Sequence, residues 1–89
     1  MDKRVWDHAK VIAGELAACV RPQRGGGYNI YAFSNPIEVG YRDRQTDEWV
    51  TLATVEVVDK QIYINGELLT GEVFRRAKEQ VRHGQTVSV

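Results

Sequence analysis

Residues 48–66 read EWVTLATVEVVDKQIYING and specify the centre of the fold. Residues 48–58 are rich in β-branched side chains, which suit the pleated surface of a strand. Because both faces of this strand are largely apolar, we expect it in the middle of a sheet. Alternation of period two assigns one face to Trp49, Thr51, Ala53, Val55 and Val57, and the other to Val50, Leu52, Thr54, Glu56 and Val58.

Two short turns follow this strand. Asp59-Lys60 predicts a tight turn into a strand over residues 61–64. Asn65-Gly66 is the strongest local signal in the chain, since both residues accept the positive φ angles of a type I′ turn. The strand over 61–64 should therefore end in a hairpin or a sharp exit.

A helix is predicted over residues 70–83. Thr70 can cap its first turn, where Glu72 faces the positive end of the helix dipole. Gly84 can end it, because glycine accepts a left-handed conformation. Residues 85–89 are expected to form a tail or a short edge strand. The apolar stripe of this helix consists of Val73, Phe74, Ala77 and Val81.

Another helix is predicted over residues 2–20. Asp2 is its expected N-cap, and Arg21-Pro22 should end it, because the residue before a proline avoids the α conformation. At 100° per residue its apolar side chains fall within an arc about 130° wide, which is typical of a helix lying on a core. That arc holds Val5, Trp6, Ala9, Ile12, Ala13, Leu16, Ala17 and Val20.

A connector and two strands should follow this helix. Residues 21–27 contain three consecutive glycines, whose backbone entropy predicts a mobile connector. Strands are expected over residues 28–33 and 37–42, the second with Ile37, Val39 and Tyr41 facing inward. In the first, Tyr31 and Phe33 point opposite to Ile30 and Ala32. If helices cover the Ile30 face, both rings stand on the open face.

These elements predict an α+β fold in α-β-β-β-β-α order. Short turns between the strands indicate an antiparallel meander, and two amphipathic helices on one face of it make a two-layer sandwich. With 89 residues, the chain is expected to be a single domain, residues 1–89. Such a short chain has a thin core, and its open sheet face carries aromatic side chains, so we expect a homodimer.

Several function classes are disfavoured by the residues present. Cys19 and His8 lie about 16 Å apart along one helix and cannot pair. No metal, cofactor or catalytic motif occurs, so we expect a non-enzymatic protein without cofactors. The lone cysteine favours a cytoplasmic protein, and no apolar run reaches the roughly 18 residues of a membrane helix.

Charge is segregated along the chain although 12 basic and 12 acidic residues cancel. In the last helix, Arg75, Lys78 and Arg82 form a strip beside the apolar stripe, which we call the basic ridge. It can contact an acidic partner or phosphates, or simply face solvent. Further arginines that could bind an anion or a nucleic acid are Arg21, Arg24, Arg42 and Arg44.

The order of helix, antiparallel sheet and helix is similar to that of the double-stranded-RNA-binding domain. That family carries a lysine-rich motif at the start of its last helix. The corresponding start here, Thr70-Gly71-Glu72-Val73, is acidic. The likeness is one of topology and implies no membership.

We therefore expect a small protein-binding module that acts as an accessory, regulatory or inhibitory protein by occupying a surface, as an inhibitor from a phage or another mobile element would. Tyr and Arg side chains are favoured in interfaces, so the expected contacts are Tyr31, Phe33 and the basic ridge. The alternative is a nucleic-acid-binding module that uses the arginines at 21, 24, 42 and 44 together with the basic ridge.

Overall fold

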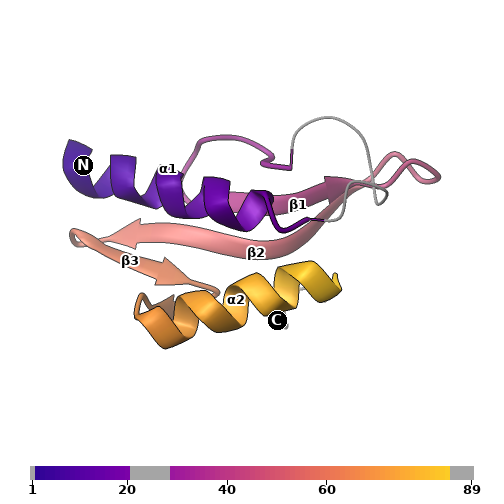
Figure 1. The fold of residues 1–89 in the computed structure, drawn as a ribbon. Coiled ribbons are helices and arrows are strands. Elements are labelled where there is room, and N and C mark those ends of the chain that lie inside the picture. Colours follow the sequence, from indigo (N-terminus) through magenta and orange to yellow (C-terminus); the bar gives the residue numbers. More distant parts are fainter. Residues whose placement is uncertain (1, 21–28, 85–89) are drawn as a thin grey trace.

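The computed structural model describes residues 2–20 and 29–84. Two helices flank four strands along the chain (Figure 1). This confirms the predicted α+β class and the α-β-β-β-β-α order. The elements are α1 (Lys3–Ala17), β1 (Ile37–Arg42), β2 (Trp49–Val58), β3 (Gln61–Ile64), β4 (Glu67–Leu68) and α2 (Gly71–His83).

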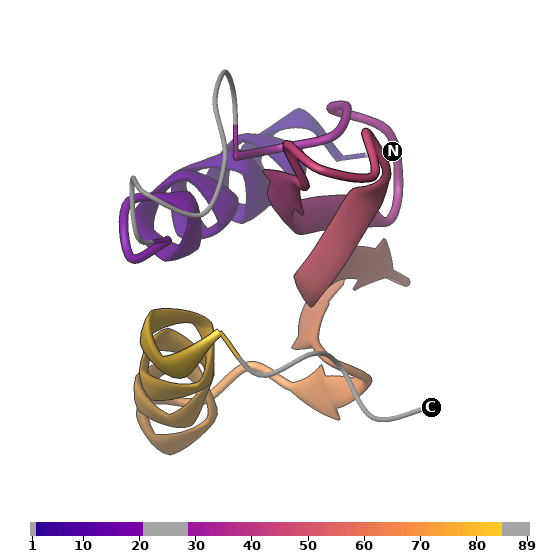
Figure 2. The same ribbon diagram turned by 90° about the vertical axis from the view of Figure 1, so that its right-hand side faces the viewer.

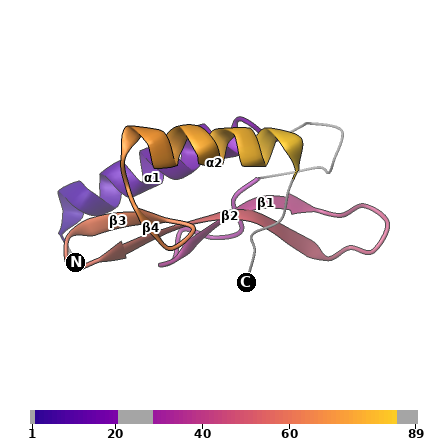
Figure 3. The ribbon, with the colours of Figure 1, turned by 90° about the horizontal axis from the view of Figure 1, so that it is seen from below.

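The strands form one antiparallel sheet in the order β1-β2-β3-β4. Both helices lie on the same face of this sheet and run in the same direction (Figures 2 and 3). α1 packs on β1 and β2, and α2 packs on β2 and β3. The structure is therefore the expected two-layer sandwich with one open sheet face, and β2 is an inner strand.

The expected strand over residues 28–33 does not form. Tyr28 lies outside the described residues, and Ile30 makes only an isolated bridge to Val39 of β1. The bridge consists of Tyr31 N donating to Glu38 O and Gly40 N donating to Asn29 O. This contact is too short to count as a strand, and the fourth strand is instead β4, the return arm of the Asn65-Gly66 hairpin.

Helix α1 begins at the predicted cap. The Asp2 carboxylate accepts hydrogen bonds from the backbone N–H of Arg4 and Val5. The helix ends at Ala17, three residues earlier than predicted, because the last turn tightens: Cys19 N and Val20 N bond to the carbonyls three residues back. The Arg21-Pro22 stop and the connector over 21–27 lie outside the described residues. The buried side chains of the predicted arc are Ala9, Ile12, Ala13, Leu16 and Val20.

A β-bulge in β2 changes which side chains share a face. Val39 pairs with Ala53 but the next residue, Gly40, pairs with Thr51, so Leu52 is an extra residue in β2. Leu52 and Ala53 are both fully buried. The predicted strict alternation is therefore wrong at this point: Trp49 and Thr51 lie on the open face, whereas Ala53, Val55 and Val57 face the helices.

Two contacts accommodate the bulge. The side-chain amide of Gln80 on α2 donates a 2.8 Å hydrogen bond to the carbonyl oxygen of Leu52. On β1, Gly40 approaches Val50 so closely that a Cβ at residue 40 would overlap the Val50 carbonyl oxygen. The bulge thus needs a glycine on one side and an amide from α2 on the other.

Both predicted turns are present. Asn65 and Gly66 have φ angles of 52° and 83°, as the type I′ prediction requires, and Asp59 and Lys60 also have positive φ. The Asn65 side chain also accepts a hydrogen bond from the backbone N–H of Thr54. An asparagine therefore ties this turn to the middle of β2.

Helix α2 has the predicted ends. Thr70 Oγ1 accepts a 3.1 Å hydrogen bond from Val73 N, and Gly84 is left-handed with φ of 70°. Val73, Ala77 and Val81 are buried against the sheet and Phe74 is half-buried. The expected tail, residues 85–89, lies outside the described residues.

Candidate protein-interaction surface

The sheet face opposite the helices carries a mixed aromatic and charged surface. Register partners share a face of a sheet, and the buried pairs, such as Ile37 with Val55 and Val57 with Ile62, identify the helix side. We call the other side the open face. Its side chains are Glu38 and Arg42 on β1; Trp49, Thr51, Thr54, Glu56 and Val58 on β2; Gln61 and Tyr63 on β3; and Leu68 on β4.

Tyr31 joins the open face beside Trp49. Their ring centroids lie 5.3 Å apart in an edge-to-face arrangement. The indole Nε1 of Trp49 donates to Thr51 Oγ1 at 3.0 Å, and that hydroxyl donates to Glu38 Oε1 at 2.7 Å. These hydrogen bonds hold the indole in one orientation, so a partly exposed aromatic pair is presented with little conformational freedom.

Three charged side chains of the open face have no ionic partner within the described part of the chain, and one of them, Glu38, accepts the hydrogen bond from Thr51. Arg42, opposite Trp49 in the register, donates from Nη1 to the backbone oxygen of Asp47. The carboxylate of the half-buried Glu56, opposite Tyr63, makes no hydrogen bond or ion pair there. Both side chains therefore remain available to a charged group of a partner.

Phe33 lies beside α1 rather than beside Trp49. It borders a hollow of about 520 Å³ together with Trp6, Asp7, Lys10 and Val11. A neighbouring hollow of about 640 Å³ is lined by residues 29–33 and by Gly14, Ala17 and Ala18 of α1. Tyr31 and Phe33, which sequence alternation placed on one face, thus both line this second hollow, but Phe33 also borders the first one, whereas the Tyr31 ring contacts Trp49.

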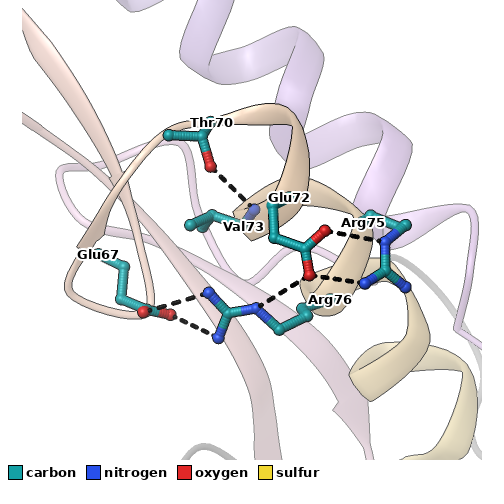
Figure 4. Close-up of polar contacts among 6 residues, drawn as sticks. All are labelled: Glu67, Thr70, Glu72, Val73, Arg75 and Arg76. Carbon is teal, nitrogen blue, oxygen red and sulfur yellow. Dashed lines mark hydrogen bonds and ion pairs between the residues drawn. The ribbon is translucent and has the colours of Figure 1, made fainter.

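The side chains of the predicted basic ridge each have a partner on α2. Arg75 contacts Glu72 at 2.6 Å, Arg82 contacts Glu79 at 2.7 Å, and Lys78 Nζ lies 4.6 Å from the centroid of the Phe74 ring (Figure 4 shows the first of these). The hydrogen bond from Arg75 lowers the pKa of the Glu72 carboxyl and raises the pKa of Arg75. These pairs leave the ridge less free to bind a partner than its sequence indicates.

Neighbouring carboxylates also balance a fourth cation of α2. Arg76 contacts Glu67 of β4 at 3.3 Å and Glu72 at 3.9 Å (Figure 4). Glu67 therefore joins the hairpin arm to the helix. Such exposed pairs contribute little to stability but do reduce the net positive potential of the helix surface.

Two of the four arginines proposed for an anion site, Arg42 and Arg44, lie within the described residues. Arg21 and Arg24 lie outside them. Arg42 ends β1, and Arg44 is exposed in the following loop, where Asp43 and Asp47 lie close in sequence.

The groups considered for chemistry are separate. His8 is exposed on α1, and Cys19 is half-buried with its Sγ 3.5 Å from the Glu15 carbonyl oxygen. Among residues 2–20 and 29–84, no cluster of three or more His, Cys, Asp or Glu side chains could hold a metal ion. In the same residues, neither helix is long and apolar enough to cross a membrane.

Sequence reasoning missed two members of the open face, Trp49 and Thr51, and the contact that joins Thr51 to Glu38. Trp49 and Thr51 were assigned to the face of Ala53 because no residue within β2 itself marks the extra residue at Leu52. Glu38 and its hydroxyl partner come from different strands, so their contact depends on register. The one available signal was Gly40, since a glycine inside a strand often marks a bulge.

Comparisons with known proteins give no identification. No protein-family model, no curated protein and no solved structure matches this chain.

Proposed function

We propose that this protein is a small, non-enzymatic protein-binding module that acts as an accessory, regulatory or inhibitory protein through its open face. The observation that carries the proposal is the Tyr31–Trp49 pair, held in place by Thr51 and Glu38 and partly exposed to solvent. Tyr, Trp and Arg are the residues most enriched among those that dominate binding energy at protein interfaces. Arg42 lies next to this pair in the register.

Apolar exposure on the same face supports a protein partner. Tyr31 is 57% exposed, and Leu68 and Val58 are exposed by 49% and 43%. They are spread across this face, from the segment that bridges to β1 as far as β4, so a partner that buries all three must cover most of the sheet. Occupying a partner's surface in this way requires no catalytic group.

Carboxylates on the open face favour a protein over a nucleic acid. Single-stranded bases stack on exposed rings, but such sites combine the rings with a positively charged groove. Here Glu38 and Glu56 flank the rings, and Arg42 is the one cation among the open-face side chains named above. Phosphates would be repelled by the two carboxylates, so nucleic-acid binding remains the second candidate.

Affinity capture with matched variants tests the proposal. We expect proteins captured by the tagged wild type, with nuclease present, to be lost with Tyr31→Ser and retained with Val11→Ser, which changes an equally exposed apolar residue on α1. Equal capture by both variants would contradict a role for the open face. Capture that disappears with nuclease, together with oligonucleotide binding that weakens steeply with salt, would favour the second candidate.

A further inference from the structure

We infer that the open face binds the same face of a second copy of this chain, related by a two-fold axis, so that Arg42 of each copy pairs with Glu56 of the other. This inference rests on the proposed function, because it names the partner of the same surface. It follows from the positions of Arg42 and Glu56, which carry opposite charges on one face and have no ionic partner among the described residues.

The two charges lie at opposite ends of β2. Arg42 is level with Trp49, and Glu56 lies seven positions further along the strand, which corresponds to about 23 Å. The midpoint between these levels falls between Thr51 and Thr54. These two side chains are small, so two sheets can approach each other closely there.

A two-fold axis through this midpoint can run between the two sheets and across their strands. Rotation about it exchanges the two ends of β2, so that the end with Trp49 faces the end with Glu56. It places the Trp49 level of one copy over the Glu56 level of the other, and the reverse contact follows from symmetry. Arg42 then needs to reach across one strand spacing, about 4.8 Å, and a sheet separation of about 10 Å. Extended arginine and glutamate side chains together span that distance.

The same arrangement covers the exposed rings. Because this axis keeps each strand over its own counterpart, Trp49 of one copy lies over Glu56 of the other, and Tyr31 lies over the β1 side of the other sheet. Aromatic side chains from both copies are then removed from water, and two ion pairs flank them. A partner of a single charge sign would gain less, because either Arg42 or the carboxylates of Glu38 and Glu56 would repel it.

The area of the sheet limits the expected affinity of the dimer. At about 3.3 Å per residue and about 4.8 Å between strands, the four strands cover on the order of 350 Å², against about 800 Å² per partner in a standard interface. We therefore expect a weak dimer, formed at high micromolar concentration. In such a dimer the two ion pairs carry a large share of the specificity.

Complementary charge reversal tests this geometry. We expect sedimentation equilibrium to show a concentration-dependent dimer for the wild type, and a dissociation constant raised more than about tenfold in Arg42→Glu and in Glu56→Arg. An equimolar mixture of the two variants should dimerise again, because position 42 of each chain then faces the opposite charge at position 56 of the other chain. Arg4→Glu and Glu15→Arg, both exposed on α1, form the control pair and should leave dimerisation unchanged.

Each other outcome contradicts the inference. A wild type that is monomeric at millimolar concentration overturns it, as does a mixture of the two variants that stays monomeric although both variants melt like the wild type. If either variant has a lower melting temperature than the wild type, the salt dependence of the wild-type dimer replaces the mixture as the test. A dissociation constant that does not rise with salt concentration then contradicts the proposed ion pairs. Capture of another protein that Tyr31→Ser abolishes would still uphold the proposed function when the dimer is absent.

Discussion

Gly40 and Val50 are in such close contact across the β1–β2 ladder that residue 40 has no room for a side chain. A Cβ there would overlap the Val50 carbonyl oxygen, and backbone atoms cannot move aside without breaking the ladder. The contact sits at the bulge that turns Trp49 and Thr51 toward the open face. The candidate binding surface thus depends on one glycine.

Gly40→Ala should lower the free energy of unfolding by about 3 kcal/mol, because the new methyl group forces the strands apart. Gly14→Ala is the matched control. Nothing lies within 4 Å of a Cβ at Gly14 in the middle of α1, so alanine should add about 0.5–1 kcal/mol through helix propensity. Urea denaturation of both variants measures the difference, and equal stabilities would show that the bulge tolerates a side chain.

Gln80→Leu should lower the free energy of unfolding by about 1–3 kcal/mol, because the Leu52 carbonyl at the bulge loses its hydrogen-bond donor from α2. Gln45→Leu makes the same chemical change at an exposed loop position and should cost little. Thermal unfolding of the two proteins gives the comparison. Identical melting temperatures would mean that water replaces the Gln80 amide at no cost.

Leu16→Asp should unfold the protein, because Leu16 is fully buried and an unpaired carboxylate there has no partner. Val11→Asp on the same helix should leave the fold intact, since Val11 is 59% exposed. Circular dichroism of both proteins checks this. A cooperative, wild-type-like melt for Leu16→Asp would refute the placement of α1 on the sheet.

Gly66→Val should destabilise the protein by about 1–3 kcal/mol through backbone strain alone. Its φ of 83° is unfavourable for a β-branched residue, although a Cβ would meet no atom within 4 Å. Gly66→Asn should lose less stability than Gly66→Val, since asparagine tolerates positive φ. If chemical denaturation gives Gly66→Val and Gly66→Asn the same free energy of unfolding, backbone strain is excluded as the cause.

The Glu72–Arg75 pair should make a small, pH-dependent contribution to stability. Because the hydrogen bond from Arg75 lowers the pKa of Glu72 below its ordinary value of 4.5, the contribution is complete above that pH and disappears as the pH falls through the folded-state pKa. The stability difference between wild type and Glu72→Gln should therefore shrink on acidification from about pH 6 to about pH 3. When Arg75→Gln is present in both proteins, the stability difference caused by Glu72→Gln should change less with pH, because the hydrogen bond from Arg75 is absent.

Local patterns in the sequence predicted much of the fold. Asp2, Thr70 and Gly84 cap the helices as expected, and Asn65-Gly66 forms the expected turn, since each acts through its own backbone conformation or through groups within a few residues. The apolar stripes of both helices also face the core, because helical period depends on the chain alone. The expected strand over 28–33 failed, since pairing to β1 depends on a distant partner.

The candidate surface required the tertiary structure. Sequence alternation identified Tyr31 as exposed, but it could not find the extra residue at Leu52 that moves Trp49 to the open face. It left open whether the basic ridge binds a partner or only faces solvent, and the structure pairs Arg75 and Arg82 with glutamates three residues away on the same helix. Helix caps and turns depend on contacts within a few residues, and so the chain alone specifies them. Strand register and a bulge depend on which backbone groups of distant strands meet, and so packing in three dimensions determines them.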